Sequence, residues 1–137
     1  MHARKSPSIL IVEDDGLIAL WLQELLKKSG YDVPDPVASG EEAIEYLKKF
    51  SSPDLILMDI TLNGSIDGIE TTRQIRQTSA IPVIFLSAHA DLNRLARAGE
   101  VGPSGFITKP FFGSNVISMV EKTLYRKTGM LLDEQKL

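Results

Sequence analysis

Short apolar runs alternate with helix-like segments along the chain, and this alternation constrains the fold more than any other feature. Four of the runs are continuous and a fifth is weaker; they lie at residues 8–12, 31–38, 55–58, 82–86 and 105–108. Apolar residues recur at helical spacing between them. Such β–α alternation predicts parallel strands whose connecting helices cover both faces of a sheet.

The helical spacing indicates five helices. They are expected from Leu17 to a C-cap at Gly30, from Ser39 to Phe50, over residues 69–77, over residues 91–98, and around residues 116–124. The second of these should bury Ala43, Ile44, Leu47 and Phe50 on one face.

The strand order follows from how buried each run should be. The first and third runs are apolar throughout, which is typical of central strands covered on both faces. The run at residues 31–38 contains Pro34 and Pro36, and proline suits an edge strand. We therefore predict an α/β fold with a doubly wound five-stranded parallel sheet in the flavodoxin-like order 2-1-3-4-5. Residues 8–126 would form one domain, and residues 127–137 a tail or the start of a linker.

Composition excludes several classes of function. The net charge of −3 gives no basic surface for nucleic acid, and the absence of cysteine removes disulfides and thiolate chemistry. No apolar segment approaches the roughly 20 residues that span a bilayer. A cytoplasmic protein that binds neither membrane nor nucleic acid directly is the expectation.

Polar residues follow the ends of four predicted strands. Glu13, Asp14 and Asp15 come after the first strand, and Asp59 ends the third. Ser87 and Lys109 end the fourth and fifth. Ligands of open α/β sheets bind outside the carboxyl ends of the strands, where the strand order reverses, so the switch between the first and third strands should bring Asp14 and Asp59 together.

Such a group of residues favours phosphoryl chemistry. Close carboxylates need a compensating cation, and all-oxygen ligands select a hard divalent ion such as Mg²⁺. A lysine and a hydroxyl at the same rim could hold phosphoryl oxygens, with Asp59 as the acceptor. Taken singly, Asp14 or Asp15 is more simply a helix cap, Ser87 a turn cap and Lys109 a solvated lysine; only their joint occurrence favours a site.

The chain also resembles the CheY-like receiver domain of two-component response regulators. The matching segments are ILIVEDD (residues 9–15), PDLILMDI (53–60), DGIE (67–70), IPVIFLSA (81–88) and GFITKPF (105–111). They occur in the family's order over about residues 8–126. The resemblance implies a phosphoprotein of a phosphorelay, in which a sensor histidine kinase or a histidine phosphotransfer protein phosphorylates Asp59.

The resemblance also implies how the acceptor works. Glu13, Asp14, Asp59 and the backbone carbonyl of Thr61 would hold Mg²⁺ or Mn²⁺, while Lys109 would pair with the phosphoryl group. The bond from Lys109 to Pro110 is usually cis in the family. Phosphoryl transfer and later hydrolysis would be self-catalysed, so the chain would be a signalling domain and not an enzyme acting on external substrates.

The switch residues are implied in the same way. The hydroxyl of Ser87 would turn toward the phosphoryl group, and Phe106 would move into the space that it leaves. Phe106 stands where many members have tyrosine, and an ordinary core phenylalanine is the alternative. Thr61 and His89 would modulate the phosphoryl lifetime, although an exposed histidine without a role is the simpler interpretation of His89. The helix at 91–98, the strand at 105–108 and the last helix would form the effector surface and a possible homodimer contact.

Other interpretations remain open at this point. A phosphohydrolase of the haloacid-dehalogenase type would need an acidic residue at Thr61, and a flavin mononucleotide carrier would need a phosphate loop where Glu13 and its acidic neighbours stand. The loop at residues 60–67 is one residue longer than in many receivers and lacks their proline. A receiver-like interaction module that is never phosphorylated is the main alternative.

Overall fold

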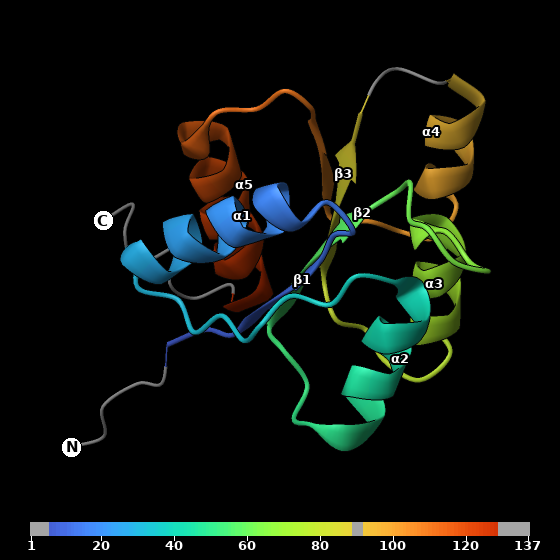
Figure 1. Ribbon diagram of the computed structural model, residues 1–137, viewed down its shortest axis with the longest axis horizontal. Coiled ribbons are helices and arrows are strands. Elements are labelled where there is room, and N and C mark those ends of the chain that lie inside the picture. The colour runs from blue at the N-terminus through green and yellow to red at the C-terminus, as the bar shows by residue number, and fades with distance from the viewer. Residues whose placement is uncertain (1–5, 89–91, 129–137) are drawn as a thin grey trace.

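A parallel sheet lies at the centre of the molecule, with helices on both faces (Figure 1). The computed structural model describes residues 6–88 and 92–128. The strands are β1 (Ile9–Val12), β2 (Leu55–Asp59), β3 (Val83–Ser87) and β4 (Gly105–Thr108), side by side in that order. The helices are α1 (Gly16–Lys28), α2 (Gly40–Lys49), α3 (Gly68–Ile75), α4 (Leu92–Gly99) and α5 (Gly113–Thr128). The predicted α/β class and the parallel sheet are confirmed.

The segment at residues 31–38 differs from the prediction, because it is not a regular fifth strand. It lies along the outer edge of β1, where the order 2-1-3-4-5 puts it, but pairs only through isolated bridges at Asp32 and Val37. In a regular parallel ladder every second residue would bond to β1, so Pro34 and Pro36 would follow Asp32, and neither has an N–H to donate. The two bridges set residues 32–37 of this segment against residues 8–12, six against five, which leaves one extra residue in the edge.

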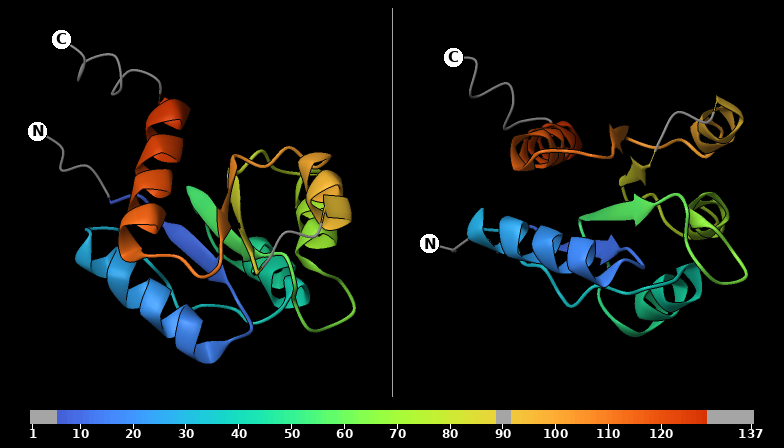
Figure 2. Two further views of the ribbon diagram at one scale, coloured as in Figure 1. Left: turned by 90° about the horizontal axis from the view of Figure 1, so that it is seen from above. Right: turned by 45° about the horizontal axis from the view of Figure 1, so that its top comes forward.

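Two apolar cores, one on each face of the sheet, hold the helices in place. The first three strands are buried along their whole length, and successive side chains point to opposite faces. Odd-numbered β1 residues such as Ile9 pack with α1 and α5, and even-numbered ones such as Leu10 pack with α2, α3 and α4. Figure 2 shows the same division of helices between the faces. Full burial of each such side chain contributes roughly 1.5–3 kcal/mol.

Polar residues mark where the helices begin. Asp15 caps α1 by accepting hydrogen bonds from the backbone N–H groups of Leu17 and Ile18 at 3.0 and 3.2 Å. Asp67 caps α3 in the same way through the N–H of Glu70 at 2.8 Å. The ends of the first four predicted helices agree with the structure within about two residues, whereas α5 begins three residues before and ends four residues after the predicted 116–124. Phe50 lies past the end of α2 and is exposed, so its assignment to the buried face was wrong.

None of the helices at residues 6–88 and 92–128 is long and apolar enough to cross a membrane.

Candidate functional site

The register of the sheet brings three functional side chains to one edge. Val12 pairs with Met58, so Glu13, the next residue after β1, comes beside Asp59 at the end of β2. Ser87 pairs with Thr108, so Lys109 emerges next to them from β4. The backbone N–H of Lys109 donates to the carbonyl of Ser87 at 2.6 Å, which ties the ends of β3 and β4 together. Polar residues at the carboxyl ends of the strands therefore do converge, as predicted.

Lys109 joins two buried carboxylates. Its Nζ lies 3.0 Å from Glu13 Oε1 and 3.1 Å from Asp59 Oδ2. Glu13 is 2% exposed and Asp59 3% exposed, so these contacts are shielded from water. Lys109 is thus no freely solvated lysine, and one ammonium group serves two carboxylates.

This sharing of one cation changes proton affinities in the site. Burial, together with hydrogen bonding to Asp59, raises the pKa of Glu13 to about 7. Burial alone would lower the pKa of Lys109, but the hydrogen bonds to Glu13 and Asp59 outweigh that effect and its pKa is raised. The site therefore holds more acidic groups than its lysine can neutralise.

A third carboxylate completes an acidic cluster. Glu13, Asp14 and Asp59 can each offer one oxygen, and these oxygens lie within 4.8 Å of one another. Asp14 is partly exposed at the mouth of the cluster, and its Oδ2 also accepts a hydrogen bond from the N–H of Asn63 at 3.1 Å. The cluster offers only oxygen ligands, carries more carboxylates than Lys109 can neutralise, and is open on one side. These properties fit a hard divalent cation such as Mg²⁺, which takes few protein ligands and keeps several waters.

The loop after β2 holds the other oxygen of Asp59. The backbone N–H of Thr61 donates to Asp59 Oδ1 at 2.9 Å, so both oxygens of Asp59 are engaged, one by Lys109 and one by the loop. The loop ends at Gly68, whose N–H donates to the carbonyl of Ile60 at 2.9 Å. A Cβ atom at Gly68 would lie 2.1 Å from the backbone oxygen of Asp59, so only glycine fits there.

The remaining predicted residues have different outcomes. Ser87 is buried at the end of β3, beside the site. Phe106 is 36% exposed with its ring centroid 5.9 Å from that of Phe85, so the alternative that it is a core phenylalanine is wrong. The Lys109–Pro110 bond is cis, as the resemblance implied. His89 lies outside the described residues.

Sequence reasoning missed two contacts of the β2–α3 loop. Arg94 of α4 donates from Nη1 to Thr61 Oγ1 at 2.9 Å, and Asn63 binds Asp14 as described above. An arginine in a short polar helix is indistinguishable in sequence from any surface arginine. Only the packing of α4 beside the loop reveals its role.

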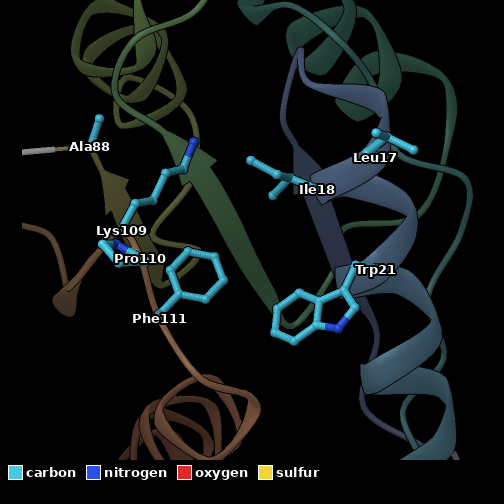
Figure 3. Close-up of a pocket in the computed structure, with 7 residues that line it drawn as sticks. All are labelled: Leu17, Ile18, Trp21, Ala88, Lys109, Pro110 and Phe111. Atoms are coloured by element: carbon cyan, nitrogen blue, oxygen red, sulfur yellow. The ribbon is translucent and has the colours of Figure 1, made fainter.

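An apolar hollow of about 490 Å³ lies next to Lys109 (Figure 3). Its walls are the side chains of Leu17, Ile18 and Trp21 from α1, together with the segment from Lys109 to Phe111 and Ala88. Leu17 is 81% exposed at its rim, and the rings of Trp21 and Phe111 are 5.8 Å apart across it. Exposed apolar side chains thus lie beside Lys109, which itself contacts Glu13 and Asp59.

The shifted pKa of Glu13 predicts how pH acts on the metal-free protein. The unfolded chain releases this proton near the ordinary pKa of 4.5, whereas the folded protein keeps it up to about 7. The folded state therefore binds more protons between those values, and stability from neutral Glu13 is lost as pH rises through about 7. The melting temperature of Glu13→Gln, relative to that of the unaltered protein at the same pH, should therefore rise between about pH 5 and about pH 8. A difference in melting temperature that does not change with pH would contradict this.

Mg²⁺ would compete with the same proton. Its stabilising effect on the unaltered protein, measured as the rise in melting temperature, should be larger at about pH 8 than at about pH 5. The control is the same measurement with Ca²⁺ at equal ionic strength. A general salt effect would raise the melting temperature equally for both ions, whereas binding in the cluster should differ because Mg²⁺ demands a more compact coordination shell.

Comparisons with known proteins agree with this geometry. A family model described as the response regulator receiver domain matches residues 9–121. The chain is 32% identical over 118 residues to the transcriptional regulatory protein PdtaR of Mycobacterium tuberculosis, covering 86% of this chain and 57% of PdtaR. It is 35% identical over 117 residues to the chemotaxis protein CheY of Bacillus subtilis, covering 85% of this chain and 96% of CheY.

A solved structure gives the same answer for the fold. The signal receiver domain of a modulated diguanylate cyclase from Desulfovibrio desulfuricans superposes with a TM-score of 0.83 at 34% identity, covering 90% of this chain and 98% of that one. The chain spans little more than half of PdtaR but nearly all of CheY and of this receiver domain. The protein belongs to the response regulator receiver family of two-component signal transduction.

Proposed function

We propose that Asp59 accepts a phosphoryl group from a sensor histidine kinase or a histidine phosphotransfer protein in a Mg²⁺-dependent reaction. One observation carries the proposal: a buried carboxylate at the end of β2 is held by Lys109 on one oxygen and by a backbone N–H on the other. Such a carboxylate is fixed in orientation and shielded from water, as a nucleophile requires. The signalling step would take place in the cytoplasm.

The transfer would proceed by in-line displacement. A carboxylate oxygen of Asp59 attacks the phosphorus, the bond from phosphorus to the donor imidazole nitrogen breaks, and the imidazole leaves. The ammonium group of Lys109 would follow the transferred group and neutralise its oxygens. Later attack by water on the phosphorus would regenerate Asp59 and release phosphate.

Glu13, Asp14, Asp59 and the backbone carbonyl of Thr61 would hold the metal ion. Bound Mg²⁺, or Mn²⁺ in its place, supplies positive charge that offsets the charge on the phosphoryl oxygens. The excess of carboxylates over cations in the cluster supports this assignment.

The output would be a change in conformation populations. Ser87 would turn its hydroxyl toward the phosphoryl group, and Phe106 would rotate inward from its partly exposed position. Because phenylalanine has no hydroxyl, this movement would add packing but no hydrogen bond. The surface of α4, β4 and α5 would then change, which would alter binding of an effector or a second copy of the chain. His89 would help to set the phosphoryl lifetime.

The hollow beside Lys109 is the surface that we assign to the phosphodonor protein. The donor must place its phosphohistidine at Asp59, so it must contact what surrounds the cluster. Leu17 and Trp21, 81% and 43% exposed, are large apolar side chains that line this hollow and suit an apolar helix face. The receiver unit would comprise residues 8–126 together with the last two residues of α5, which ends at Thr128, and the rest of residues 127–137 would form a tail or the beginning of a linker.

Phosphoryl gain tests the proposal directly. The purified protein, incubated with Mg²⁺ and an acyl phosphate donor, should gain one phosphoryl group in its intact mass. A chelator should prevent the gain, because the carboxylate cluster would then repel the anionic donor. If the mass does not change under conditions that label another receiver domain, the phosphoacceptor proposal fails, and an unphosphorylated interaction module replaces it.

A further inference from the structure

Two arginines of α4 reach across to the loop that follows Asp59. Arg94 donates from Nη1 to Thr61 Oγ1 at 2.9 Å, at the start of this loop. Arg97 Nη2 lies 3.6 Å from Asp67 Oδ2, at the end of the loop. The two arginines are three residues apart, so they project from the same side of the helix. In Figure 1, α4 lies above α3 with the β2–α3 loop beside it.

The first of these contacts leads straight to the phosphoacceptor. Thr61 donates its backbone N–H to Asp59 Oδ1 at 2.9 Å while its hydroxyl accepts from Arg94. A single residue therefore separates the guanidinium group from the carboxylate. Lys109 holds the opposite oxygen, Oδ2, so the acceptor lies between a direct cation and one that acts through Thr61.

The second contact keeps Arg94 in place. Asp67 caps α3 with Oδ1 and faces Arg97 with Oδ2, so its position is fixed by the helix that it begins. Anchoring of α4 at this end of the loop reduces the freedom that Arg94 would lose on binding Thr61. Preorganisation of this kind lets a partly exposed hydrogen bond hold its geometry.

We infer that Arg94 is a positioning residue for the phosphoryl group: by pinning the Thr61 side chain at the mouth of the site, it restricts the approach of water and prolongs the phosphorylated state. The inference rests on the proposed function, because it concerns hydrolysis of the Asp59 phosphoryl group. Thr61 is exposed and borders the acceptor, so its side chain stands where solvent reaches the site. Without Arg94 that side chain could rotate freely.

The test is the rate of phosphoryl loss after the donor is removed. Arg94→Gln should lose the phosphoryl group roughly fivefold faster than the unaltered protein, the effect of one lost hydrogen bond of ordinary strength. Thr61→Val, which keeps the backbone and the shape of the side chain but removes the acceptor oxygen, should hasten the loss to a similar degree. The double variant should be no faster than either single one, because both changes remove the same contact.

Arg73→Gln is the matched control. Arg73 lies on α3 and pairs with Glu70 on the surface, so the change removes the same charge without touching the loop. Its decay rate should equal that of the unaltered protein. If Arg94 had only a structural role, Arg94→Gln would lower the melting temperature, but the effects of Arg94→Gln and Thr61→Val on the decay rate would not depend on each other.

The outcomes separate the two proposals. If the unaltered protein gains a phosphoryl group but Arg94→Gln decays at the same rate, or if the two single effects multiply in the double variant, the inference about Arg94 is overturned and the proposed function stands. If the unaltered protein gains none, both are overturned.

Discussion

Asp59→Asn should abolish phosphoryl gain completely while the protein stays folded. Asparagine has nearly the shape of aspartate but no nucleophilic carboxylate oxygen, so no acyl phosphate can form. Two buried carboxylates share Lys109, and burial, together with the hydrogen bond to Asp59, raises the pKa of Glu13. Removing one charge leaves Lys109 to Glu13 alone, so the variant should be at least as stable as the unaltered protein at about pH 8.

Intact mass after incubation with Mg²⁺ and an acyl phosphate measures the effect, and melting temperature confirms folding. Asp54→Asn is the matched control: Asp54 lies just before the opposite end of β2, where its Oδ2 accepts from the N–H of Ser8 at 2.8 Å. This control should gain the phosphoryl group normally. Phosphoryl gain by Asp59→Asn would mean that another residue is the acceptor.

Gly68→Ala should cause a large loss of stability for the addition of a single methyl group. The added carbon would lie 2.1 Å from the backbone oxygen of Asp59 and 3.0 Å from the Cα of Ile60, and neither backbone atom can rotate away. Relief requires α3 to move off β2, at a cost of about 1–3 kcal/mol. The melting temperature should fall by roughly 5–10 °C. Phosphorylation should also slow, because the displaced atoms carry the acceptor side chain.

Gly99→Ala is the counterpart of this experiment. Gly99 ends α4, nothing lies within 4 Å of a Cβ built there, and its φ is not positive. Alanine favours helix over glycine, so this change should be neutral or stabilise the protein by up to about 1 kcal/mol. Equal melting temperatures for the two variants would show that α3 and β2 are not in the close contact described.

The sequence predicts most of the fold because strand burial leaves a clear pattern. The runs at residues 9–12 and 55–58 are continuous in apolar residues because helices cover both sides of the sheet. The edge segment at residues 31–38 was mispredicted as a regular strand, because its apolar pattern does not show which hydrogen bonds it can make. Its residues are apolar enough, but Pro34 and Pro36 remove donors that a regular ladder needs, and periodicity alone does not register missing hydrogen bonds.

The site was predictable as far as the strands position it. Glu13, Asp59 and Lys109 directly follow or end paired strands, so topology alone brings them together. Contacts that depend on loops and helix packing were not predictable. Arg94 meets Thr61 across 33 positions of sequence through a hydrogen bond that no spacing rule anticipates.

The irregular edge beside β1 has a consequence for how the protein behaves at high concentration. An exposed, regular edge strand can recruit a strand from another molecule and start aggregation. Here residues 32–37 lie against residues 8–12, six against five, and two prolines interrupt the row, so an incoming strand could not keep its register. The same irregularity that prevents residues 31–38 from forming a regular fifth strand should therefore also prevent a strand of a neighbouring molecule from pairing with this edge.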